Sequence, residues 1–174
     1  MTFQRFITLT LLCVTVGCTS RTAQRTHSFG LYLTTSPVDR RLIAYGTGDW
    51  THVALSETPV ISDADIVDYD FTTHSLRVTP AALARIPRPL VEGTPFVVVA
   101  DGQRIYLGVF TTGRSSMSFA VPNIMVDRRA MFTNQPADTV LIERAYPSSS
   151  FGVGPDPRSD ARVRQALAAL QKLK

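Results

Sequence analysis

The feature that most constrains the fold is a β-hairpin signal between residues 94 and 110. Residues Pro95–Ala100 form an apolar run that suits a strand buried on both faces, and Arg104–Phe110 form a second run. Between them, Asp101-Gly102 supplies the two positive φ angles that a type I′ turn requires. Two apolar strands joined this tightly predict a hairpin at the centre of a sheet.

Shorter signals flank this hairpin. We expect further strands at Phe29–Thr34, Arg41–Tyr45, His52–Leu55, Ser75–Val78, Ala120–Val126 and Thr139–Ala145. Because Pro122 cannot donate a ladder hydrogen bond, the strand that contains it is expected at an edge. Ser62 and Asp65 have the spacing of a capping box and predict a short helix. Thr79-Pro80 predicts a second helix, which ends before Pro87.

The C-terminal segment has the pattern of an amphipathic helix. Val163, Leu167, Leu170 and Leu173 recur at near-helical spacing, and polar residues occupy the other faces. The chain is 44% hydrophobic and 18% charged, which is ordinary for a folded domain. We therefore predict an α+β fold: a single small domain with a mostly antiparallel sheet, short helices and this C-terminal helix docked on the sheet.

The N-terminus has the parts of an export signal. A short basic head precedes an apolar run, Phe6–Val16, whose eleven residues are about half of what a transmembrane helix needs. Thr15-Val16-Gly17-Cys18 resembles a lipobox, the motif at which bacterial lipoprotein precursors are acylated and cleaved. The expected organisation is a lipoprotein signal peptide at residues 1–17, a flexible tether at 18–28 and the α+β domain at 29–174.

Lipid attachment at Cys18 explains the cysteine content. Cys13 leaves with the signal, so the mature chain keeps one cysteine and forms no internal disulfide. Acyl chains such as palmitate on Cys18 would hold the protein on a membrane. Since Thr19 follows where an Asp would retain the protein at the inner membrane, we expect the outer membrane, facing the periplasm. The alternative is an ordinary secretory signal cleaved elsewhere, for instance near Ala23.

The residues that suggest chemistry each have a structural alternative. Asp63, Asp65, Asp68 and Asp70 suggest calcium, but the Gly and Glu of an EF-hand loop are missing, and capping or a solvated face explains them as well. His27, His52 and His74 lack zinc-binding spacing. Ser115, Ser116 and Ser118 lie in a loop without a nucleophile elbow. Trp50 is either a partner anchor or a core residue. We therefore expect no metal and no cofactor.

The basic residues argue against nucleic acid. The formal charge is +4, and the arginines are scattered along the sequence. A nucleic-acid-binding surface would cluster them on one element with interleaved aromatic residues. A mildly basic solvated surface is the better interpretation.

Three stretches, Thr58–Ile66, Phe96–Ile105 and Val121–Ile124, together resemble the periplasmic head region of SecD, a membrane subunit that assists protein export. The resemblance covers about residues 55–126. It implies a sandwich of sheet and helices and transfers no translocation activity.

Three functional hypotheses remain from the sequence. The first is a non-catalytic, lipid-anchored envelope protein that binds a protein partner or envelope component. The second is an envelope hydrolase or small-molecule binder in which Asp68, His74, Ser115 and Arg114 converge. The third, an accessory of protein export, depends on the SecD resemblance alone.

Overall fold

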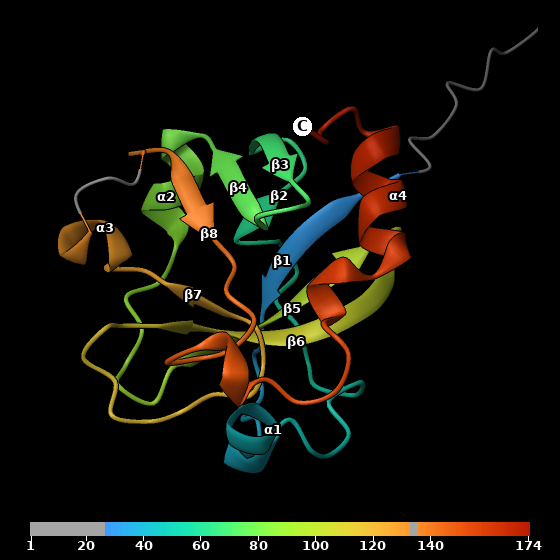
Figure 1. Cartoon of the computed structure of the whole chain (residues 1–174). Helices are drawn as coiled ribbons and strands as arrows, with labels where there is room; N and C mark the ends of the chain where they lie inside the picture. Colours follow the sequence, from blue (N-terminus) through green and yellow to red (C-terminus); the bar gives the residue numbers. More distant parts are fainter. Residues whose placement is uncertain (1–26, 133–135) are drawn as a thin grey trace, which may run out of the picture.

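The hairpin expected around Asp101-Gly102 forms the centre of the larger of two sheets (Figure 1). The computed structural model describes residues 27–132 and 136–174. Strands β5 (Thr94–Ala100) and β6 (Gln103–Thr111) pair antiparallel across the turn. Asp101 and Gly102 have φ angles of 49° and 75°, as a type I′ turn requires. The prediction of a central hairpin is confirmed.

Three further strands complete the larger sheet in the order β2-β1-β5-β6-β7. They are β1 (Phe29–Leu33), β2 (Ile61–Ser62) and β7 (Asn123–Met125). The edge strand β7 runs parallel to β6, whereas the other pairs are antiparallel. Pro122 stands just before β7, where its carbonyl accepts the Val109 N–H at 2.9 Å and no N–H is needed. The expected edge strand is therefore present, although shorter than predicted.

The smaller sheet has the order β3-β4-β8 and is antiparallel. Its strands are β3 (Ile66–Asp70), β4 (Ser75–Val78) and β8 (Thr139–Leu141). The C-terminal residues follow the outer edge of β3. The Tyr69 N–H donates to the Lys172 carbonyl at 2.7 Å, and the Lys174 N–H donates to the Tyr69 carbonyl at 3.0 Å. This edge of the small sheet is thereby covered.

Two hydrophobic clusters lie on the two faces of the larger sheet. One fills the space between the two sheets, where Leu76 of β4 and Phe96 of β5 are fully buried. Helices α2 (Pro80–Arg85) and α4 (Ala161–Ala169) close this cluster, α4 through Val163, Ala166 and Leu167. The other cluster lies beneath α1 (Arg40–Tyr45) on the opposite face. The predicted α+β class, α2 and the docked C-terminal helix are confirmed, although the helix ends at Ala169 and Leu173 lies beyond it, in a bridge with Tyr69.

The strand predicted for Arg41–Tyr45 is wrong, because this segment is helix α1. The Asp39 carboxylate accepts the Arg41 N–H at 2.9 Å and caps the first turn. Gly46 ends the helix in the left-handed conformation, with its N–H on the Leu42 carbonyl. Both signals are in the sequence, and they outweigh the strand-like composition between them.

The short helix predicted after Ser62 is also wrong. The Ser62 N–H and hydroxyl do donate to the Asp65 carboxylate, at 2.8 and 2.6 Å. These bonds close a tight turn between β2 and β3 instead of starting a helix. The reason is tertiary, since Ile61 and Ile66 on either side of the turn are each buried in a strand.

Other predicted strands are shorter than expected. Residues 52–55 contribute one isolated bridge, between Thr34 and Leu55. Of the strand predicted at Thr139–Ala145, the first part is β8, and Glu143 makes an isolated bridge to Asn123. The short helices α3 (Arg128–Met131) and η1 (Ser149–Phe151) were not anticipated at these positions. Both helix starts that the sequence offers near the C-terminus are used, Asp156 by η2 (Pro157–Ser159) and Asp160 by α4.

Candidate functional site

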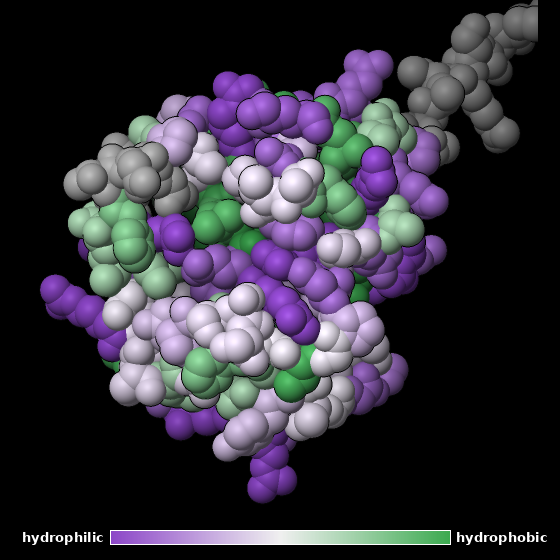
Figure 2. All heavy atoms as spheres, in the orientation of Figure 1, coloured by the Kyte–Doolittle hydropathy of each residue, from purple (hydrophilic) through white to green (hydrophobic). Residues whose placement is uncertain are grey.

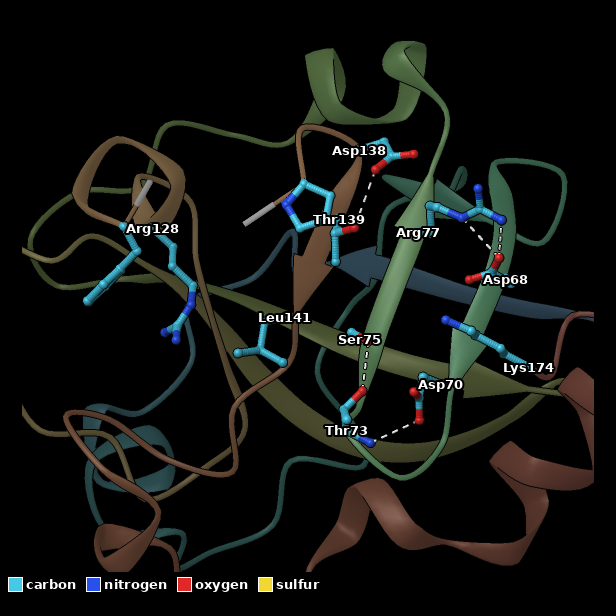
Figure 3. A pocket seen from close by; sticks show the side chains of 12 residues that line it. Asp68, Asp70, Thr73, Ser75, Arg77, Arg128, Asp138, Thr139, Leu141 and Lys174 are labelled. Atoms are coloured by element: carbon cyan, nitrogen blue, oxygen red, sulfur yellow. Dashed lines mark hydrogen bonds and ion pairs between the residues drawn. The ribbon is translucent and has the colours of Figure 1, made fainter. Parts of the chain in front are cut away.

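The outer face of the smaller sheet carries polar side chains from all three strands (Figure 3). Along β3 and β4, the outward Asp68, Asp70, Ser75 and Arg77 alternate with the buried Tyr69 and Leu76. We call the following set the polar face: Asp68, Asp70, Ser75, Arg77, Thr139 and Leu141. The period of two that places one residue in the core directs the next to this surface.

A cavity of about 870 Å³ lies over the polar face. Arg128 of α3 and the C-terminal Lys174 stand on opposite sides of it in Figure 3. Phe132, Pro136 and Asp138 complete its wall. The cavity is in the size range of small-molecule sites, which run from about 300 to 1,000 Å³.

The charged side chains of the polar face are each held by defined hydrogen bonds. The register sets Asp68 opposite Arg77, and Arg77 Nε donates to the Asp68 carboxylate at 2.9 Å. This hydrogen bond raises the pKa of Arg77. Asp70 accepts the backbone N–H groups of Thr73 and Thr72, and these bonds lower its pKa. Both signs of charge are therefore fixed on this surface at neutral pH.

A second, more apolar hollow lies beside the first. We call it the groove; it has a volume of about 520 Å³ and lies between the end of α2 and strands β7 and β8. Its apolar lining includes Leu83, Ile86, Ile124, Val126 and Leu141. Figure 2 shows the surface hollowed in the region of β8, with hydrophobic residues at the floor.

Arg128 lines both the cavity and the groove. Its guanidinium donates to the Glu143 carboxylate at 2.7 Å and lies 4.9 Å from the centre of the Phe132 ring. The two contacts hold the arginine at the boundary between the polar and the apolar hollow. The two hollows adjoin at the residues they share, Arg128, Thr139 and Leu141, and we treat them together as the candidate site.

Beneath the polar face lies a buried pair, Tyr69 and His74. The Tyr69 hydroxyl is 2.8 Å from His74 Nδ1. Burial, followed by the nearby charge of Arg158, lowers the pKa of His74, and burial raises the pKa of Tyr69. Arg158 is itself paired with Asp156, Nε to Oδ1 at 2.9 Å. When the imidazole is neutral, its Nδ1 can accept a hydrogen bond from the Tyr69 hydroxyl. The hydrogen bond satisfies both buried polar groups.

The four residues proposed for a hydrolytic site do not converge, and three of them have separate partners. Asp68 binds Arg77, His74 binds Tyr69, and the Ser115 hydroxyl donates to the Val91 carbonyl at 2.7 Å. Arg114 is exposed in the loop before Ser115. No hydrogen bond between described residues joins any two of the four, and only Asp68 lines the cavity over the polar face.

Several of the remaining candidates are held by contacts with other side chains. Asp65 binds Ser62 and Arg85, His27 binds Asp101 at 3.1 Å, and His52 lies 3.4 Å from Asp49. Among residues 27–132 and 136–174 there is no group of three His, Cys, Asp or Glu side chains suited to a metal. Trp50 is half-buried against the second hydrophobic cluster. Cys18 lies outside the described residues.

Several residues of the site were not anticipated from the sequence. Arg77, Arg128, Asp138 and Lys174 line the cavity but stand far apart along the chain. The outward position of Arg77 could have been predicted, because polar and apolar residues alternate in β3 and β4. No local pattern indicates that α3 and the C-terminus meet over the same sheet.

Comparison with known proteins assigns no family: no protein-family model, curated protein or solved structure matches this chain. In the described part of the chain, no helix combines the length and apolar character needed to cross a membrane. The resemblance of residues 55–126 to the SecD head region stays a prediction. The functional assignment therefore depends on the polar face and the groove themselves.

Proposed function

We propose that this protein is a lipid-anchored component of the cell envelope that binds a protein partner through the polar face and the groove, without catalysing a reaction. The anchor is acylated Cys18, as the lipobox-like Thr15–Cys18 sequence indicates. Its expected place is the outer membrane, facing the periplasm.

The observation that carries the proposal is the position of the site relative to the anchored end. The Ser28 N–H donates to the Asp101 carboxylate at 2.8 Å, so the chain enters the domain at the turn of the β5–β6 hairpin. Thr112, which lines the groove, follows the opposite end of β6. Nine strand residues separate these points, which corresponds to about 30 Å. A lipid at Cys18 would thus leave the groove free for a partner.

The separate partners of Asp68, His74 and Ser115 favour binding over hydrolysis. A nucleophile needs its base within hydrogen-bond reach, and the Ser115 hydroxyl instead donates to a backbone carbonyl. A small-molecule binder is the second candidate, which the volume and mixed polar lining of the cavity over the polar face favour.

Site-specific photo-cross-linking in a lipoprotein-processing bacterium tests the proposal. A photoreactive amino acid replaces Thr73, which is exposed in the cavity, and in a matched control replaces Arg41, exposed on α1 beneath the other face of the larger sheet. We expect a discrete protein adduct from position 73 in the membrane fraction and none from position 41. An acylated protein that gives no adduct at position 73 would contradict a protein partner there.

The small-molecule alternative predicts a different result. A ligand co-purified with the native protein and released on denaturation, detected by mass spectrometry, would support it. Substitution of Arg77 by Ala should then abolish its retention.

A further inference from the structure

A backbone bridge joins the two sheets at one end of the groove. Asn123 of β7 and Glu143, just after β8, exchange two backbone hydrogen bonds of 2.9 and 2.8 Å. From this bridge, β7 and β8 diverge (Figure 1). The groove occupies the space between them.

On the β8 side, one backbone edge faces away from its own sheet. The Ile142 N–H donates to the His74 carbonyl at 3.1 Å, and the Val78 N–H donates to the Asp138 carbonyl at 2.8 Å. In an antiparallel ladder with this register, Val140 directs its N–H and C=O to β4. The N–H and C=O of Leu141 therefore point away from β4.

On the β7 side, the same argument applies to Met125. The Val126 N–H donates to the Thr111 carbonyl, and the Val109 N–H donates to the Pro122 carbonyl, both at 2.9 Å. The parallel ladder to β6 thus uses the backbone groups of Ile124. The N–H and C=O of Met125 point away from β6, and Met125 and Leu141 both line the groove.

Two strand edges that border one groove match a particular ligand. An added peptide strand can pair with an exposed sheet edge through its main chain, while alternate side chains occupy pockets. Here Leu83, Ile86 and Ile124 provide an apolar floor for such side chains. We propose that the groove binds an extended peptide segment of the partner, inserted as a strand between β7 and β8; this inference rests on the proposed function.

One position at the groove favours an acidic residue in the bound segment. Asp127 accepts the Gly113 N–H at 2.8 Å, and Arg128 is paired with Glu143. Arg88 is exposed at the groove and has no carboxylate partner among the described residues. Arg88 is therefore a cationic side chain at the groove without an ion-pair partner among the described residues, and a Glu or Asp of the bound segment beside it would complement its charge.

Selection from a random nonapeptide display library tests this inference. The target is the full acylated chain in lipid nanodiscs, and Ile86→Trp is the variant that fills the groove. We expect the selected peptides to alternate apolar residues, to contain an acidic residue and to lose binding to Ile86→Trp. Methylation of the backbone nitrogens that face one edge should weaken binding about tenfold or more, since each lost hydrogen bond is worth about 1 kcal/mol.

A charge-reversal pair provides the matched control. Arg88→Glu should weaken binding of the selected acidic peptides about tenfold. Replacing the acidic residue of these peptides by Lys should restore their binding to the Arg88→Glu variant. Arg41→Glu on α1 should not change the binding of either form of the peptides. Because both arginines are exposed, neither variant should alter the fold.

Failure of the peptide selection or a second occupant of the groove would overturn the inference. The inference fails if no peptide is enriched on the wild type over Ile86→Trp, or if N-methylated peptides bind equally well. It also fails if Ile86→Trp abolishes a concentration-dependent dimerisation, which would assign the groove to a second copy of this chain. A cross-link from position 73 that persists while peptide selection fails would remove this inference and leave the proposed function intact.

Discussion

The backbones of Asn123 and Glu143 exchange two hydrogen bonds and so join the edge strands of the two sheets. The Asn123 side chain is fully buried at this junction. Its Oδ1 accepts the Thr111 hydroxyl at 3.4 Å, and its Nδ2 has no partner among the described residues. The point where the sheets separate to form the groove is thus marked by an incompletely paired polar side chain.

Substitutions should show that the hydrogen bond between the Thr111 and Asn123 side chains does not make a net contribution to stability. The single variant Asn123→Leu leaves the Thr111 hydroxyl buried without its partner and should lower the free energy of unfolding by about 1–3 kcal/mol. The double variant Asn123→Leu/Thr111→Val replaces both groups and should recover most of that loss. Chemical denaturation measures all three proteins, and a double variant less stable than the single one would contradict this account.

His74 should make stability depend on pH in the window that opens near the ordinary histidine pKa of about 6.5 and extends below it. Its folded-state pKa lies below the ordinary value of about 6.5, through burial and then the charge of Arg158, with Asp156 and Asp70 acting in the opposite direction. As the pH falls, the unfolded chain therefore binds a proton first. The free energy of unfolding should therefore decrease as the pH falls from about 6.5 toward the folded-state pKa of His74. The slope is at most about 1.4 kcal/mol per pH unit.

His74→Asn is the control for this pH dependence. His74 has a φ of 56°, a conformation that Asn tolerates. The variant should lose the component of the pH dependence that His74 contributes, as measured by urea denaturation across the window. An unchanged pH profile in the variant would assign the effect to other groups.

Gly102→Ala should destabilise the protein by about 1–2 kcal/mol, because Gly102 has a φ of 75°. No atom lies within 4 Å of the added Cβ, so the loss is backbone strain and not a clash. Gly102→Asn should recover most of it, since Asn is favoured in type I′ turns. Thermal unfolding compares the variants; equal losses for Ala and Asn would contradict the strain argument.

Arg77→Ala should leave the stability of the protein close to that of the wild type. Arg77 and Asp68 form an ion pair at the surface, where such pairs contribute little. If this variant is stably folded but no longer binds the ligand, the loss of binding is due to the changed polar face and not to unfolding. A thermal midpoint far below that of the wild type would show that the pair has a structural role.

The sequence predicts the parts of this fold that local signals determine. The Asp101-Gly102 turn, the Thr79-Pro80 helix start and the Val163–Leu173 periodicity each specify an element by themselves. The segment from Ser62 to Asp65 could not be predicted in the same way, because its capping hydrogen bonds serve a helix or a turn equally well and the burial of Ile61 and Ile66 decides between them.

The candidate site depends still more on tertiary structure. Asp68 was singled out from its sequence neighbourhood, whereas Arg128 and Lys174 reach the cavity only because α3 and the C-terminus pack around the smaller sheet. Strand pairing also decides which backbone groups remain exposed at Met125 and Leu141. Neither relationship has a local sequence signal.

The lipid anchor is the part of the proposed function that one measurement tests most directly. The full precursor and its Cys18→Ala variant are expressed in a lipoprotein-processing bacterium, and intact masses are taken from the membrane fraction. We predict a chain that begins at acylated Cys18 for the wild type and loss of both acylation and membrane retention in the variant. An unmodified chain that begins at another residue, released from the membrane, would contradict the account.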